Sequence, residues 1–117
     1  MNLREIQMIL EADVLVGDQW LDREPSSVCG SDLLSDVLAF TKEKSLLLTG
    51  LTNPQVIRTA EMSDLIGIVF VRGKKPETAT VELAGIKKIP ILTTRLPMYE
   101  ACGRLYRHGI RGCSEIK

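Results

Sequence analysis

Apolar residues occur along this chain in two alternating patterns, and their alternation predicts strands separated by helices. Three continuous apolar runs, 45–49, 66–71 and 89–93, are each bounded by turn residues. Such runs are typical of parallel strands buried on both faces. Apolar positions with helical spacing follow each run, over 55–62, 76–85 and 97–109. Repeated strand–helix units of this kind predict right-handed crossovers and a largely parallel sheet.

The expected helix ends carry residues with suitable capping chemistry. Asn53 before Pro54 predicts a helix start, because Asn accepts free backbone N–H groups and proline fits the first turn. Pro76 and Pro97 are expected to open the next two helices. Gly85 is the expected cap at the end of the second of these three helices.

The first third of the chain is less regular. Asn2 and Glu5 have the spacing of a capping box, so a first helix is expected up to Leu10. Further elements follow in order: a short strand over 13–17, a loop over 18–25, a possible strand over 26–30, and a helix capped by Ser31 or Asp32 that runs to Phe40. The pattern leaves the positions of these early strands in the sheet open.

Length and composition favour one globular domain over residues 1–117. A chain of 117 residues with 44% hydrophobic and 26% charged residues can bury one core, and neither disorder nor a fibre fits these values. We therefore expect a three-layer α/β/α fold, with helices on both faces of a largely parallel sheet. No apolar run is long enough for a membrane span or a signal peptide, so a cytoplasmic location is expected.

The overall charge balance argues against a nucleic-acid partner. Fifteen basic residues balance fifteen acidic ones, and the aromatic content of 4% offers no stacking platform for bases. The charge is uneven along the chain, since residues 1–40 hold eight acidic residues and two basic ones. Either the halves interleave in the fold, or the chain has a dipole that favours head-to-tail association or presents a basic face to an anion.

Polar and cationic residues follow the three apolar runs. Ligands of open parallel sheets bind where strands end and helices begin, and helix starts attract anions. The predicted anion site comprises Thr49, Gly50, Thr52, Asn53, Arg72, Gly73, Lys74, Thr93, Thr94 and Arg95. A phosphate, a nucleotide or a carboxylated metabolite would suit these groups. The alternative is that the cations are solvated and that Thr and Asn only cap helices.

Other chemistry has weaker support in the sequence. A nucleotide-hydrolysing P-loop is excluded, because five residues separate Gly67 from Gly73 and Lys75 stands where a hydroxyl residue is required. Asp32 and Asp36 are interpreted as a residue of a first helical turn and its solvated neighbour, so no catalytic residue is assigned.

The three cysteines give no metal or disulfide signature. Cys29, Cys102 and Cys113 lack paired spacing, which suits a reducing compartment, and neither a metal nor a cofactor is predicted. Buried packing thiols are one interpretation. The other is a redox or metal role, with Cys113 as the expected exposed thiol.

Five blocks of the segment 29–102 follow one another in a set order: Gly30–Ala39, Leu46–Gly50, Ile68–Gly73, Ile89–Thr94 and Met98–Ala101. The order of these blocks resembles that of the DRTGG domain family. Where the family has Gly-Asp-Arg and Thr-Gly-Gly, this chain has Gly50-Leu51-Thr52 and Arg72-Gly73-Lys74, so only Gly50 and Gly73 match. The domain occurs in phosphate acetyltransferases and in CBS-domain proteins, and it is similar to the N-terminal domain of HPr kinase/phosphorylase.

The resemblance implies an accessory, regulatory role, and the family has no settled catalytic residue to carry over. We therefore expect a non-enzymatic domain, forming a homodimer, that binds a partner protein or a small anionic metabolite such as a nucleotide. One alternative is a small enzyme or phospho-acceptor acting at the strand ends. The other is a thiol redox sensor, which would require Cys102 or Cys113 to be exposed with a lowered pKa.

Overall fold

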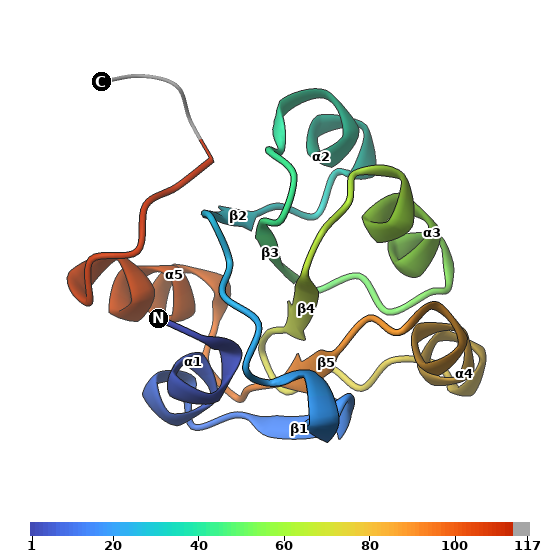
Figure 1. Ribbon diagram of the computed structural model, residues 1–117, viewed down its shortest axis with the longest axis horizontal. Coiled ribbons are helices and arrows are strands. Elements are labelled where there is room, and N and C mark those ends of the chain that lie inside the picture. Colours follow the sequence, from blue (N-terminus) through green and yellow to red (C-terminus); the bar gives the residue numbers. More distant parts are fainter. Residues whose placement is uncertain (114–117) are drawn as a thin grey trace.

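The computed structural model describes residues 1–113, which form a sheet covered by helices on both faces (Figure 1). The strands are β1 (Asp13–Val16), β2 (Val28–Gly30), β3 (Leu46–Thr49), β4 (Gly67–Phe70) and β5 (Ile91–Thr93). The helices are α1 (Leu3–Leu10), α2 (Leu34–Phe40), α3 (Gln55–Met62), α4 (Thr78–Lys87) and α5 (Met98–Arg107). A short 3₁₀ helix, η1 (Asp18–Trp20), follows β1.

The strands lie in the order β1-β5-β4-β3-β2. The four strands from β2 to β5 are parallel neighbours, which confirms the largely parallel sheet. β1 pairs antiparallel with β5, and its register shifts between Val14 and Val16. The strand whose place was left open by the sequence therefore occupies an edge, with its first residue beside the carboxyl end of β5.

The apolar runs are continuous because both faces of the central strands are buried. Successive residues of a strand point to opposite faces, so each face needs its own helical cover. Leu46, Leu48 and Val69 pack with α1 and α5. Leu47 and Ile68 pack with α2, α3 and α4. Figure 1 shows these two sets of helices on opposite sides of the sheet, which confirms the three layers.

Local capping explains where α1 begins. The Asn2 side chain accepts from the Glu5 backbone N–H at 3.0 Å, and the Glu5 carboxylate accepts from the Asn2 N–H at 3.2 Å. The capping box is therefore confirmed. Asn53 also acts as expected at the start of α3, since its side chain accepts from the Gln55 N–H at 3.0 Å.

The expected end of α4 at Gly85 is wrong. The helix continues to Lys87, and Lys88 takes the left-handed conformation at φ 59°. The Ile89 N–H donates to the Ala84 carbonyl at 2.9 Å while the Ile89 side chain is buried. The buried residue after the helix fixes the cap, because its apolar contact accompanies this pattern of closing hydrogen bonds.

The two halves of the chain interleave, as one of the two charge interpretations predicts. The acidic segment 1–40 supplies both edge strands, β1 and β2, while the later residues supply the centre of the sheet. An ion pair between Glu11 and Arg104 also joins the halves, with 3.0 Å between carboxylate oxygen and guanidinium nitrogen. Interleaving leaves no acidic half separated from a basic half.

Truncation of Val69 to Ala should lower the free energy of unfolding by about 2 kcal/mol, because this fully buried side chain lies in the middle of β4. Denaturant unfolding measures the change. Ile86→Ala is the matched control, since the Ile86 side chain is 73% exposed and should change stability by less than about 0.5 kcal/mol. Equal losses in the two variants would contradict the assignment of β4 to the core.

Candidate functional site

A cleft of about 520 Å³ lies where β4 and β5 end and β1 begins. The residues that line this strand-end cleft are Leu10, Glu11, Asp13, Gly73, Lys75, Thr93, Thr94, Arg95 and Leu96. Its place in the fold has a topological reason. The chain leaves β4 toward α4 on one face of the sheet and leaves β5 toward α5 on the other. Connections that diverge in this way open a crevice at the carboxyl ends of the two strands.

Backbone hydrogen bonds join the loop after β4 to the loop after β5 at the cleft. The Gly73 N–H donates to the Thr94 carbonyl and the Arg72 N–H donates to the Leu96 carbonyl, both at 2.8 Å. Arg72 and Gly73 both have positive φ, at 60° and 67°, so the chain turns sharply after β4. A Cβ on Gly73 would meet no atom within 4 Å, so backbone conformation rather than space favours glycine there.

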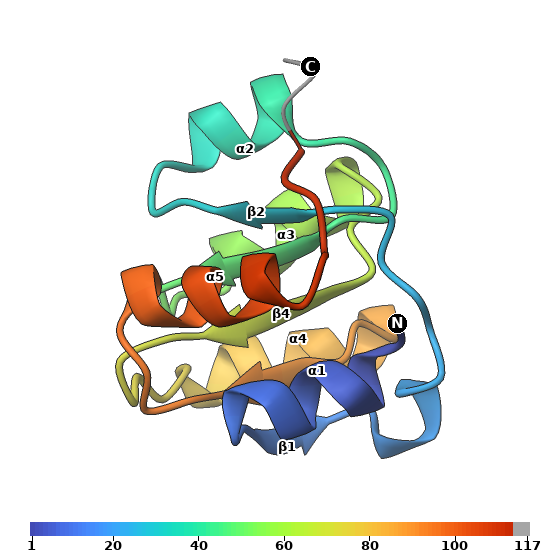
Figure 2. The ribbon, with the colours of Figure 1, turned by 90° about the vertical axis from the view of Figure 1, so that its left-hand side faces the viewer.

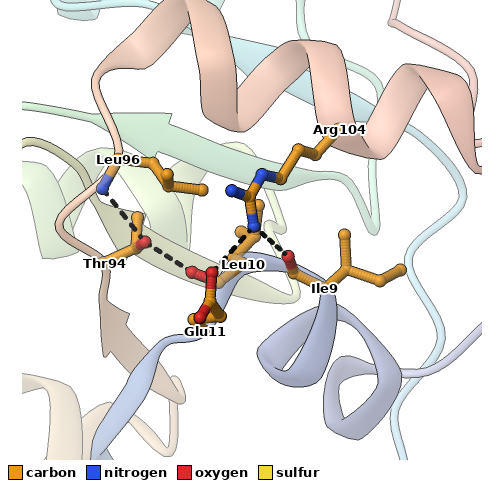
Figure 3. Close-up of polar contacts among 6 residues, drawn as sticks. All are labelled: Ile9, Leu10, Glu11, Thr94, Leu96 and Arg104. Atoms are coloured by element: carbon orange, nitrogen blue, oxygen red, sulfur yellow. Dashed lines mark hydrogen bonds and ion pairs between the residues drawn. The ribbon is translucent and has the colours of Figure 1, made fainter.

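The buried hydroxyl of Thr94 joins the end of β5 to the end of α1 (Figure 3). It donates to the Leu10 carbonyl at 2.7 Å and accepts from the Leu96 N–H at 3.3 Å. Beside it, the Arg104 guanidinium donates to the Ile9 carbonyl at 3.2 Å (Figure 3). A cation at these last carbonyls stabilises the helix end, and the same guanidinium balances the Glu11 charge.

The charges around the cleft have both signs. Lys75 and Arg95 are exposed cations on its rim, while Asp13 contributes an exposed carboxylate from the start of β1. Because Arg104 pairs with Glu11, Asp13 is the lining carboxylate without an ion pair in the described part of the chain. The cleft can therefore receive a group with negative charge on one side and hydrogen-bond donors on the other.

The structure brings four of the ten predicted site residues into this cleft: Gly73, Thr93, Thr94 and Arg95. Arg72 and Lys74 belong to the same loop after β4 but do not line it. The predicted residues after β3 are engaged elsewhere. The Thr52 carbonyl accepts from the Thr80 hydroxyl at 2.7 Å, and Asn53 caps α3.

Asp32 occupies the donors at the end of β3. Its carboxylate accepts from the Thr49 hydroxyl at 3.0 Å and from the Gly50 N–H at 2.7 Å. The interpretation of Asp32 as a cap or first-turn residue of α2 is therefore wrong, because α2 starts at Leu34 and has no side-chain cap. The protein's own carboxylate thus lies where an external anion would bind Thr49 and Gly50, and its charge disfavours a second anion there.

Sequence reasoning missed Glu11, Asp13 and Lys75 as cleft residues. Lys75 follows a strand end, and that position alone could have indicated it. Glu11 and Asp13 reach the site only because β1 pairs antiparallel with β5, with Asp13 opposite Thr93. Asp32 is likewise placed by the register of the sheet, since Gly30 pairs with Leu48 and Asp32 then falls opposite Gly50.

Among residues 1–113, no three His, Cys, Asp or Glu side chains gather to hold a metal ion. No helix in the same range is long and apolar enough to cross a bilayer.

Comparison with known proteins identifies the family. The sequence profile of the DRTGG domain matches residues 5–107, so the chain belongs to the DRTGG domain family. This match is wider than the segment 29–102 on which the resemblance rested. No protein with a curated description matches the chain in sequence.

The fold is also similar to a solved structure. That structure contains the CBS and DRTGG domains of the regulatory region of Clostridium perfringens pyrophosphatase, complexed with its activator diadenosine tetraphosphate. The TM-score is 0.76 at 17% sequence identity, over 88% of this chain. This chain spans 45% of the solved one, so the similarity is one of fold.

Replacing Thr94 with Val should lower the free energy of unfolding by about 1–3 kcal/mol, because the buried Leu10 carbonyl would lose its donor while the side-chain volume stays similar. Thr93→Val is the control, since the Thr93 hydroxyl bonds the Lys74 carbonyl in an exposed position. Thermal and denaturant unfolding compare the two variants. A smaller loss for Thr94→Val than for Thr93→Val would contradict the role of this hydroxyl.

Proposed function

We propose that this DRTGG domain is a non-catalytic regulatory domain that binds a small phosphorylated metabolite, specifically a nucleotide, in the strand-end cleft. The observation that carries the proposal is the mixed charge of this cleft at the divergence of β4 and β5. Lys75 and Arg95 would bind the phosphates by charge-assisted hydrogen bonds. Asp13 would accept hydrogen bonds from sugar hydroxyls, as acidic residues at strand ends do in nucleotide-binding sheets.

The threonine hydroxyls of the cleft already donate hydrogen bonds to backbone carbonyls. This favours a site that binds a phosphorylated ligand over one that transfers its phosphoryl group. Thr93 donates to the Lys74 carbonyl at 2.9 Å, and Thr94 donates to the Leu10 carbonyl. A nucleophilic hydroxyl needs a neighbouring base to take its proton, and these protons are directed to backbone carbonyls. The small-enzyme alternative therefore gains no support from these two residues.

The related fold supports a nucleotide as the ligand class. The pyrophosphatase regulatory region, which contains a DRTGG domain together with CBS domains, was solved with a dinucleotide activator that carries four phosphates. The present cleft offers two cations on one rim, which suits several neighbouring phosphates better than a single carboxylate. The support for a nucleotide therefore rests on the similar fold of the pyrophosphatase domain and on the match between phosphates and the two cations of the cleft.

Self-association as a homodimer, binding of a protein partner and thiol redox sensing stay predictions. Tyr99 and Tyr106 on α5 are 87% and 77% exposed, and such aromatic side chains suit a homodimer or a protein partner. Cys102 does not meet the requirement for a low-pKa redox sensor, because it is half-buried and burial raises the pKa of its thiol.

Calorimetric titration with ATP and with diadenosine tetraphosphate tests the site. Arg95→Ala and Lys75→Ala should each weaken binding by about 1–3 kcal/mol, roughly 5- to 150-fold, through the loss of one charge-assisted contact. Arg58→Ala is the matched control, because Arg58 is an exposed arginine on α3 outside the cleft. Equal weakening by Arg58→Ala, or no binding of either nucleotide, would contradict the proposal.

The variant Asp13→Asn distinguishes the proposed contact with the sugar from the proposed contacts with the phosphates. It should weaken binding of ATP through the sugar hydroxyls, yet strengthen binding of inorganic tripolyphosphate, because a negative charge near the phosphates is removed. Adenosine, which lacks phosphate, should bind far more weakly than ATP. A change of the same sign for ATP and tripolyphosphate would place the nucleoside away from Asp13.

A further inference from the structure

The segment after α5 lies along the outer edge of β2, at the side of the sheet far from the strand-end cleft. Figure 2 shows this segment, drawn in red, beside β2 on its way toward α2. The Val28 N–H donates to the Arg111 carbonyl at 2.9 Å. Val28 and Gly112 form a parallel bridge, so the segment extends the sheet beyond β2 by one short pairing.

This register makes Cys29 and Cys113 neighbours. Each is the next residue after a bridged position, so the backbone of Cys113 lies beside that of Cys29. Adjacent strands lie about 4.8 Å apart, within the Cα separation of roughly 4.4–6.8 Å that a disulfide requires. Cys113 also contributes to the raised pKa of Cys29, as expected of two thiols that lie close together.

The third cysteine lies on the other face of β2 from Cys29, since Cys102 packs with the cluster of α1 and α5 and Cys29 with that of α2, α3 and α4. Cys102 on α5 packs against β2 so closely that a Cβ on Gly30 would lie 2.8 Å from its sulfur. Cys102 also lines a groove of about 370 Å³ with Val28 and Gly112.

We propose that Cys29 and Cys113 form a reversible intramolecular disulfide that fixes the segment 110–113 on the edge of β2. Oxidised glutathione, a low-molecular-weight disulfide, is a sufficient oxidant. The Cys113 thiolate attacks one glutathione sulfur and releases the first glutathione thiolate. The Cys29 thiolate then attacks the Cys113 sulfur and releases the second. The two protons lost by the cysteines end on the two glutathione thiols, so the exchange is balanced.

The order of attack follows from the environment of Cys29. Burial first, and then the hydrogen bond and charge of Cys113, raise the pKa of Cys29 to about 11. Its thiolate is therefore scarce near neutral pH, which makes it a slow attacker of free disulfides. Held next to Cys113, it resolves the mixed disulfide in an intramolecular step.

The disulfide would close an otherwise open sheet edge. An edge strand presents unpaired N–H and C=O groups that can pair with another chain. One bridge and one backbone hydrogen bond join the segment to β2 while the cysteines are free thiols, and a covalent bond would hold it there more firmly.

Peptide mapping after equilibration with oxidised glutathione tests the proposal directly. Trypsin places the three cysteines on different peptides, 24–42, 96–104 and 112–117, so each possible linkage has its own mass. We expect 24–42 joined to 112–117 within one chain, both in the natural sequence and in Cys102→Ser. Cys29→Ser and Cys113→Ser should abolish it. The melting temperature should rise on oxidation by on the order of 10 °C, and only in the two proteins that form the linkage.

Three results would overturn the proposal: a linkage that includes peptide 96–104, a linkage between chains, or retention of three free thiols in excess oxidised glutathione. If Cys113→Ser folds poorly, the free-thiol result for the natural sequence still decides the question. The test does not depend on ligand binding, because the disulfide and the strand-end cleft lie at opposite edges of the sheet.

Discussion

Burial of β3, β4 and β5 on both faces is the constraint on which the rest of the structure depends. Backbone groups of these strands are satisfied by parallel pairing, and their side chains need helices on both sides. The crossovers that join β2 to β5 place α2, α3 and α4 on one face. The other face is then left for α5 and α1, and this change of side after β5 opens the strand-end cleft.

The order and direction of the strands also decide which charged groups lie at the ends of β3 and β5. Asp32 reaches the end of β3 because β2 is its parallel neighbour, and it satisfies Thr49 and Gly50 from within the protein. At the end of β5, the neighbour is the antiparallel β1, whose Asp13 faces outward beside the cations of two loops. A carboxylate of the protein thus fills one potential anion site, while the other keeps room for a ligand.

The two edges of the sheet support separate chemistry. The edge at β1 is shaped by polar groups and loops, whereas the edge at β2 is bordered by thiols and exposed tyrosines of α5. A ligand in the cleft would contact the loops after β4 and β5. A disulfide at β2 would instead hold the segment after α5 on that edge, so the two proposed sites would act independently.

The sequence by itself determined the elements and the layers. The apolar runs before Gly50 and Arg72, the Asn2–Glu5 capping box and the proline starts are local signals, and each depends on neighbours within one helical turn or strand. The loops with Gly73, Thr94 and Arg95 were also predictable, because parallel strands must end at the same edge of the sheet.

Only the tertiary structure decided which of these loop residues share a cleft, and which residues from distant segments join them. Asp13, Asp32 and the Cys29–Cys113 pair are placed by strand order, direction and register, which arise from packing across the whole sheet. The end of α4 at Lys87, with Lys88 as its cap, was likewise set by the burial of Ile89 rather than by Gly85. Long-range pairing has no local signature, because its free energy comes from residues far apart in the chain that meet only in the folded state.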